Sequence, residues 1–275
     1  MSNDRFVVYR TRGKRHGPIT RLVSPGDLGE LIKPFVFLDY IEAPAGSGPN
    51  FGFHPHSGIA TLTFPITFEI QHETSTGQID TVKAGGLEWM MAGSGIWHRG
   101  KAGGESPLRG FQTWFSMPPS HENSEPCAQF LQAAELPEAG PVKLLLGTYG
   151  NLRSAIAPPV DVSYLWVSLA AGQTWRFDPP AEHNVAWAFS ETGSLQVCGV
   201  SLERELAVFD EGSGSLEFRA EGGPCCFLFG SAKKHNHSLQ LGNYSVHTTP
   251  EALRLGEERI RALGQDLRAQ GLLNQ

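Results

Sequence analysis

The chain has few cysteines, and their spacing excludes the common thiolate motifs. It contains four cysteines, and no two of them have the Cys-x-x-Cys spacing of a zinc or redox site. Cys225 and Cys226 lie in the apolar run Pro224–Phe229, which is typical of a buried strand. A metal site built on thiolates is therefore disfavoured.

The chain also lacks the signatures of membrane and nucleic-acid proteins. No window approaches the roughly 20 apolar residues that span a bilayer, and the N-terminal residues have no apolar core of signal-peptide length. We therefore expect a soluble, cytoplasmic protein without membrane contact. Lys and Arg number 22 against 28 Asp and Glu, and the net charge of −6 includes no basic block. Direct binding to nucleic acid is accordingly not expected.

Glycine and proline are abundant and predict an all-β chain. With 32 Gly and 19 Pro, turn signals separate short apolar runs about every 8–12 residues, as in β-sandwiches and β-barrels. The number of candidate strands suits two successive β-domains. Two polar, proline-containing segments, 117–126 and 151–159, place the boundary near residue 150, which predicts domains at 1–150 and 151–275.

One helix is well signalled, at about 250–270. Thr249 is a suitable N-cap and Pro250 a suitable first helical residue. Apolar residues then recur at helical spacing opposite a charged face, at Leu253, Ile260, Leu263 and Leu267. We expect this helix to cover a β-sheet.

Three histidines have the arrangement of a metal site. His54 and His56 lie two residues apart, so on a strand both side chains project to the same face. His98 follows a glycine-rich run and can join them from a neighbouring strand. Neutral imidazole suits iron, copper, nickel and zinc, and the trio predicts one such ion.

The segments around these histidines resemble the pirin family, which belongs to the cupins. The resemblance is dense over about residues 20–120 and rests on three stretches of sequence, which are Pro34–Asp39, His54–Thr63 and Trp89–His98. It implies two cupin (jelly-roll-like) β-barrels with a C-terminal helix, and a metal in the N-terminal barrel. In the family the metal is held by three histidines and one glutamate, and the histidines correspond to His54, His56 and His98.

The family's glutamate is missing from this chain. It is expected two residues after the third histidine, where the chain has Gly100, which has no side chain to offer a metal. Glu88, Glu105 and Gln112 are candidate substitutes on nearby segments. The alternative is that the barrel has lost its metal and that the histidines are hydrogen-bonded polar residues of a pocket.

Other histidines carry weaker signals. His72 ends a predicted strand, where a solvated hairpin end is favoured over a role beside the metal. His183 has no partner two residues away, so the C-terminal barrel is predicted to be metal-free. His235 and His237 have that spacing, but the preceding lysines favour an exposed loop.

Two functions of different classes follow. The first, implied by the resemblance, is a quercetin 2,3-dioxygenase-like enzyme that uses Fe(II), or else copper, nickel or zinc, on a small aromatic, flavonol-like substrate. Its catalytic residues are unknown, because Gly100 removes the expected general base. The second is a non-enzymatic cupin that binds a regulatory protein partner or a small molecule, with weakened or lost metal.

Overall fold

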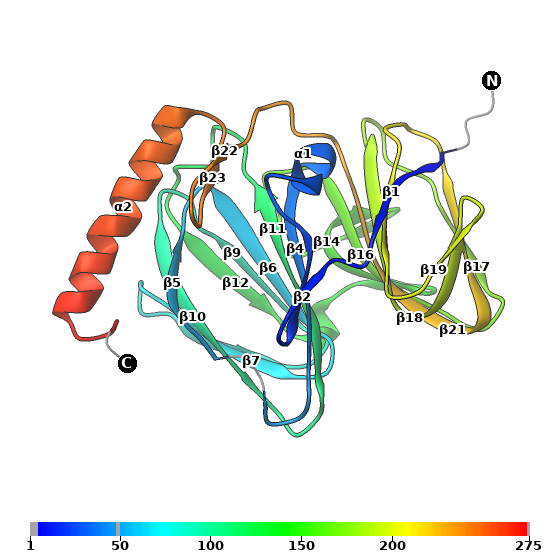
Figure 1. Cartoon of the computed structure of the whole chain (residues 1–275), viewed down its shortest axis with the longest axis horizontal. Coiled ribbons are helices and arrows are strands. Elements are labelled where there is room, and N and C mark those ends of the chain that lie inside the picture. Colours follow the sequence, from blue (N-terminus) through cyan, green and yellow to red (C-terminus); the bar gives the residue numbers. More distant parts are fainter. Residues whose placement is uncertain (1–4, 48–49, 274–275) are drawn as a thin grey trace. The chain divides into compact units, whose positions relative to one another are not determined.

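The computed structural model describes residues 5–47 and 50–273, and strands make up most of it (Figure 1). The helical elements are α1 (Leu28–Ile32), a 3-10 turn (Ala133–Glu135) and α2 (Pro250–Ala269). The strands are β1 (Val7–Thr11), β2 (Lys14–His16), β3 (Ile19–Val23), β4 (Phe35–Ala43), β5 (Asn50–His56), β6 (Ile59–Pro65), β7 (Glu69–Thr74), β8 (Ile79–Val82), β9 (Leu87–Met91), β10 (Ile96–Gly103), β11 (Leu108–Ser116), β12 (Cys127–Leu131), β13 (Glu138–Ala139), β14 (Val142–Tyr149), β15 (Leu152–Arg153), β16 (Val162–Leu169), β17 (Thr174–Phe177), β18 (Val185–Val197), β19 (Val200–Leu202), β20 (Leu206–Phe209), β21 (Leu216–Ala232), β22 (Gln240–Leu241) and β23 (Val246–His247). The prediction of a β protein that ends in a helix is confirmed.

Contacts between residues divide the chain into two compact units. The histidine unit comprises Arg15–Glu30, Phe35–Glu135 and His235–Gln275. The second unit comprises Met1–Lys14, Leu31–Pro34 and Leu136–Lys234. This division differs from the predicted ranges 1–150 and 151–275. The reason is long-range pairing, because β1 pairs with β20 in the second unit while α2 contacts β5 and β10 in the histidine unit.

Two sheets of the histidine unit build the interior that contains the histidines. One has seven strands in the order β12-β9-β6-β11-β4-β3-β2, and its central strands β6 and β4 are buried almost throughout. The other has four strands in the order β5-β10-β7-β8. In β7 every second side chain is buried, as expected for a strand with one face towards a core. Side chains from both sheets therefore meet in one interior.

The second unit has its own core. Its ten-stranded sheet includes the path β1-β20-β18-β21-β16-β14-β13. Aromatic side chains dominate this core, and Trp175 stacks on Phe218 while Phe177 lies 4.6 Å from Phe229, measured between ring centroids. A buried apolar core of this kind is sufficient reason for the strands to pair.

Helix α2 begins as the sequence predicts. Thr249 is the N-cap, and its Oγ1 accepts a hydrogen bond from Ala252 N at 3.1 Å. The helix contacts β5, β10, β22 and β23 (Figure 1). No helix within residues 5–47 and 50–273 is long and apolar enough to cross a membrane.

Candidate metal centre

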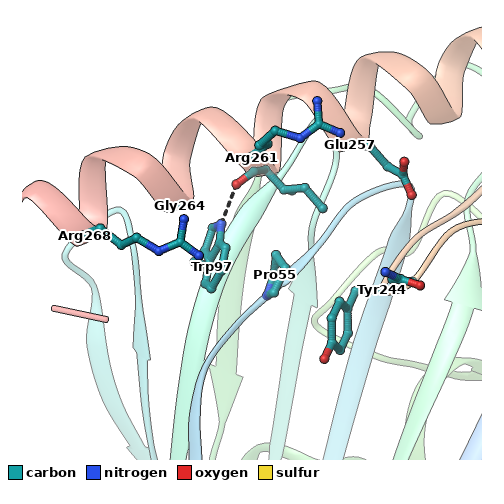
Figure 2. A pocket seen from close by; sticks show the side chains of 9 residues that line it. Pro55, Trp97, Tyr244, Glu257, Arg261, Gly264 and Arg268 are labelled. Carbon is teal, nitrogen blue, oxygen red and sulfur yellow. Dashed lines mark hydrogen bonds between the residues drawn. The ribbon is translucent and has the colours of Figure 1, made fainter. Parts of the chain in front are cut away.

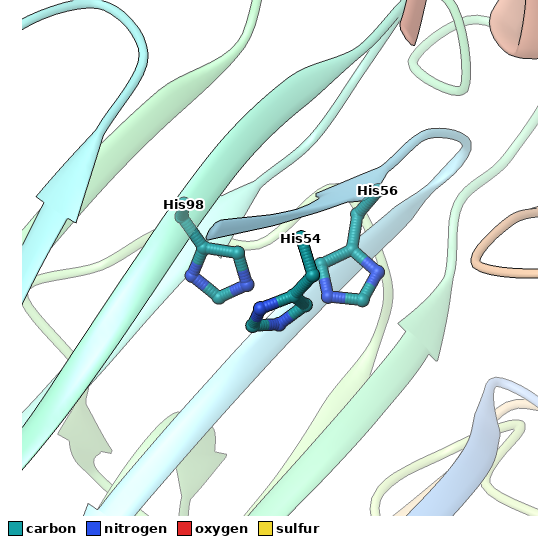
Figure 3. A group of neighbouring side chains, drawn as sticks. All are labelled: His54, His56 and His98. Carbon is teal, nitrogen blue, oxygen red and sulfur yellow. The ribbon is translucent and has the colours of Figure 1, made fainter. Parts of the chain in front are cut away.

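Strands β5 and β10 bring the three predicted histidines together. The strands are antiparallel, with His98 opposite His54 and Ile96 opposite His56. Residues directly opposite on paired strands share a face, and residues two apart do so as well. His54, His56 and His98 therefore point into the same interior, and Figure 3 shows their rings converging.

The convergence is close enough for one ion. The candidate ligand atoms of the three histidines all lie within 4.8 Å of one another. The ring centroid of His98 lies 4.3 Å from that of His54 and 5.0 Å from that of His56. His56 and His98 are buried, at 1% and 3% exposure, whereas His54 is half-buried. The trio thus forms a mostly dry site with one more accessible edge.

Hydrogen bonds orient each ring through Nδ1. His54 Nδ1 donates to Gly52 O at 2.8 Å, and His56 Nδ1 donates to Tyr244 O at 3.0 Å. His98 Nδ1 is hydrogen-bonded to His72 Nε2 at 2.6 Å, while its buried Nε2 has no hydrogen-bond partner among the described residues. Carbonyl acceptors at Nδ1 leave the Nε2 lone pairs of His54 and His56 free, as in histidine ligands of metals.

Burial keeps these imidazoles uncharged. It lowers the pKa of His54, lowers that of His56 to about 3, and lowers that of His98 well below its usual value. Like charges on the neighbouring rings act in the same direction. A neutral imidazole keeps a lone pair for a metal, so the trio fits a transition-metal ion in ligand type and in protonation state.

His72 and Glu88 adjoin the trio, and His72 corrects an expectation. His72 was expected at a solvated hairpin end, yet it is 1% exposed, because its position in β7 faces inward. Its Nε2 lies 2.9 Å from Glu88 Oε1, and Glu88 is equally buried. Burial is the largest single effect and opposes both charges. The attraction between the two partners, together with Asp80 near His72 and Thr63 near Glu88, still raises the pKa of His72 and lowers the pKa of Glu88. The two side chains therefore lie next to each other in the interior, in contact with His98.

Gly100 lies on the inward face of β10 as well. It is directly opposite His72 on β7 and contributes no side chain to the interior. Of the candidate substitutes, Glu105 is exposed, Gln112 is half-buried, and Glu88 is grouped with His72 and His98 through ligand atoms within 4.8 Å of one another. The sequence offered Glu88 as one candidate among three, and the structure brings it to the site.

A small cavity adjoins the histidines between the two sheets. Its volume is about 20 Å³, and its lining includes His54, His98, Glu88, Gly100 and Gln112. A cavity of that size has room for about one water molecule. It therefore accommodates a single ion or small molecule and is much smaller than a flavonol.

A larger groove lies on the opposite face of the same strands. Pro55 and Trp97 alternate with the histidines along β5 and β10, so they face away from the trio. They line a groove of about 250 Å³ together with α2, and Trp97 Nε1 donates to Ile260 O at 2.7 Å (Figure 2). The groove is separate from the cavity beside the histidines, and α2 forms one of its walls.

The remaining histidines form no metal cluster within residues 5–47 and 50–273. His183 is bound to Asp161 and Ser231, which explains its burial in the second unit. His235 is buried and its Nε2 donates to Met117 O at 3.1 Å, so the expected exposed loop is wrong at this residue. His237 is exposed, as expected.

Comparison with known proteins gives consistent relatives. The Pirin family profile matches residues 18–115. A "Pirin-like protein" of Caulobacter vibrioides is 32% identical over 214 residues, which cover 72% of this chain and 73% of the relative. A Pseudomonas aeruginosa protein named "Putative quercetin 2,3-dioxygenase" is 30% identical over 220 residues, which cover 74% of this chain and 76% of the relative.

Solved structures show the same fold. A quercetin 2,3-dioxygenase from Acinetobacter baumannii has a TM-score of 0.85 at 20% identity and covers 98% of this chain and 99% of its own. The bacterial pirin YhhW from Escherichia coli, in complex with nickel(II), has a TM-score of 0.63 at 21% identity and covers 84% of this chain and 98% of its own. These likenesses confirm the cupin fold that the sequence predicted.

Proposed function

The chain belongs to the pirin family, and we propose that it is a metalloprotein that holds one divalent transition-metal ion on His54, His56 and His98. One observation carries the proposal. Two of the imidazoles are oriented through Nδ1 by backbone carbonyl oxygens, and the third has a buried Nε2 without any hydrogen-bond partner among the described residues. A buried polar atom without a partner is costly, and a bound ion would remove that cost.

The ion proposed first is Fe(II), with copper, nickel or zinc as alternatives. Imidazole nitrogen binds all four metals, so the donor set does not choose between them. The nickel(II) complex of the Escherichia coli pirin supports a transition metal in this fold. When bound, the ion would supply Lewis-acid chemistry and, for iron or copper, redox chemistry.

The reaction proposed for the site is a dioxygenase reaction on a flavonol-like aromatic substrate. The relative named as a quercetin 2,3-dioxygenase supports this reaction class. The chain's own contribution is to hold three neutral nitrogens in a dry interior, with half-buried His54 at the more accessible edge. Because the cavity is about 20 Å³, a flavonol requires the interior to open at that edge.

Metal analysis and oxygen uptake test the proposal. Protein purified without chelating resin should contain about one first-row metal per chain, and His56→Ala should lower that content at least ~10-fold. After anaerobic metal loading, wild type should consume oxygen with a flavonol faster than His56→Ala does. Equal metal content in the two proteins contradicts the metal site, and equal oxygen uptake contradicts the dioxygenase reaction.

The small cavity favours a second candidate function, which is a non-enzymatic pirin-type protein. In this hypothesis the site binds a metal or a small molecule, and its state changes the affinity for a regulatory protein partner. A cavity that admits about one water molecule is sufficient for that role without any opening. A metal-loaded protein that consumes no oxygen with any flavonol supports this candidate, whereas a flavonol-dependent uptake lost in His56→Ala contradicts it.

A further inference from the structure

Glu88 is a buried carboxylate that the trio by itself does not explain. It lies on β9 in the seven-stranded sheet and is 1% exposed. Its Oε1 has no hydrogen bond of acceptable geometry among the described residues, although His72 Nε2 lies 2.9 Å away. Burial of a carboxylate oxygen without a hydrogen bond costs free energy unless a further positive group faces it.

The position of Glu88 indicates what that positive group is. The carboxylate borders the same cavity of about 20 Å³ as His54 and His98. Its ligand atom also lies within 4.8 Å of those of His72 and His98. The trio supplies three neutral nitrogens, so a dication bound there has no negative ligand among them, and a carboxylate at the wall of a dry cavity stabilises such an ion.

The backbone of β10 explains why the carboxylate comes from the facing sheet. Gly100 shares the inward face of the strand with His98 and has no side chain. His72 lies directly opposite Gly100 and extends from β7 to Glu88 on β9. A Cβ at Gly100 would lie 3.0 Å from Ile70 Cδ1, the flexible end of a side chain, so a Cβ fits there after a small shift of Ile70.

We propose that Glu88, held in place by His72, supplies the negative charge for the ion on His54, His56 and His98, in the role that a residue at position 100 cannot fill in this chain. The inference rests on the proposed metal site. His72 is a positioning residue in this scheme, because it fixes the carboxylate and contacts His98. The charge of the site is therefore supplied across the interior, from one sheet to the ligands of the other.

Metal affinity of matched variants tests the inference. Dissociation constants for Ni²⁺ and Zn²⁺ are measured by chelator competition for wild type, Glu88→Gln and Glu73→Gln. Glu73 is the matched control, because it follows His72, carries the same charge and pairs with Arg99 near the surface. We expect Glu88→Gln to bind at least ~10-fold more weakly than wild type and Glu73→Gln to bind like wild type. Equal losses in both variants overturn the inference.

A rescue variant separates a role at the metal from a role in folding. In Glu88→Gln/Gly100→Glu the carboxylate returns from β10, and we expect most of the lost affinity to return. If thermal unfolding shows that Glu88→Gln is unfolded, metal-induced infrared difference spectra of wild type replace it. A shift of a buried carboxylate band on Zn²⁺ binding supports the inference, and its absence overturns it.

The outcomes distinguish this inference from the proposed function. If His56→Ala binds metal as tightly as wild type, the trio is not the site and the proposed function fails. If His56→Ala loses the metal while Glu88→Gln keeps wild-type affinity, the trio stands and the role of Glu88 fails.

Discussion

The three histidines depend on neighbours that fix their Nδ1 atoms. The acceptor for His56 is Tyr244 O, which lies 188 residues further along the chain. The acceptor for His54 is the local Gly52 O. Backbone carbonyls are dependable acceptors because no substitution removes them, although a shift of the segment does. The orientation of His54 and His56 thus depends on one local carbonyl and one distant segment.

Acid should destabilise the metal-free protein through His56. Its pKa falls from 6.5 to about 3 on folding, because burial disfavours the imidazolium. Below pH 6.5 the unfolded chain binds a proton that the folded chain does not. The contribution of His56 to the free energy of unfolding is therefore complete above that pH and is lost as pH falls towards 3, at about 1.4 kcal/mol per pH unit.

The comparison of wild type with His56→Asn isolates that contribution. Asn keeps a donor for Tyr244 O but has no imidazole to titrate. Urea unfolding of chelator-treated protein should show that wild type loses stability relative to His56→Asn as the pH is lowered from about 6.5 to about 4.5. A difference that is the same across this range contradicts the prediction.

Helix α2 packs on the neighbouring strands through glycine residues as well as through apolar side chains. The expected stripe included Leu253, Ile260, Leu263 and Leu267, but the residues buried in the structure are Ala252, Gly256, Ile260, Gly264 and Leu267. A Cβ at Gly256 would lie 2.5 Å from Ser57 Oγ and 2.6 Å from His247 Nε2. Those two atoms are themselves hydrogen-bonded at 3.0 Å, so the helix packs closely on a polar network.

Gly256→Ala should destabilise the protein despite the better helix propensity of alanine. The propensity gain is about 1 kcal/mol, whereas the forced shift of the helix from Ser57 and His247 costs about 1–3 kcal/mol. We expect a net loss of about 1 kcal/mol in thermal or urea unfolding. Gln265→Ala, on the exposed face of the same helix, is the control and should change stability by less than about 0.5 kcal/mol. A more stable Gly256→Ala protein contradicts the close packing.

The two units are each assembled from segments that are distant in the sequence. The C-terminal segment from His235 returns to the histidine unit, where Ser245 Oγ accepts a hydrogen bond from Ser57 Oγ at 2.7 Å. Glu122 in the same unit accepts hydrogen bonds from Thr248 N and Thr248 Oγ1. The N-terminal strand β1 instead belongs to the second unit, through its pairing with β20.

Deletions at the two ends should therefore affect different properties of the protein: metal affinity at the C-terminal end and stability at the N-terminal end. A chain that ends at Lys234 loses α2 and Tyr244, so we expect its affinity for Zn²⁺ to fall at least ~10-fold. A chain that begins after Thr11 loses β1 and should keep the wild-type affinity, while its thermal stability falls. Circular dichroism checks that each chain retains its strands. Wild-type affinity in the chain that ends at Lys234 would contradict the role of the C-terminal segment.

Local patterns in the sequence were sufficient to predict the main elements and the three histidines that meet in the interior. The His54–His56 spacing works on any strand, because alternate side chains share a face, and Thr249 with Pro250 caps a helix wherever it packs. These rules act over a few residues. They are sufficient to predict the three histidines, helix α2 and the β class of the chain without knowledge of how the strands pair.

Tertiary structure alone decided which groups surround the trio. The sequence left Glu88 as one candidate among three and favoured a solvated position for His72. The two residues meet His98 because β9 and β7 contribute side chains to the same interior. The carbonyl of Tyr244 has no sequence signal at all, since every residue has one. Pairing of distant strands depends on burial of the whole core, so it decides the division into units and which side chains surround the three histidines.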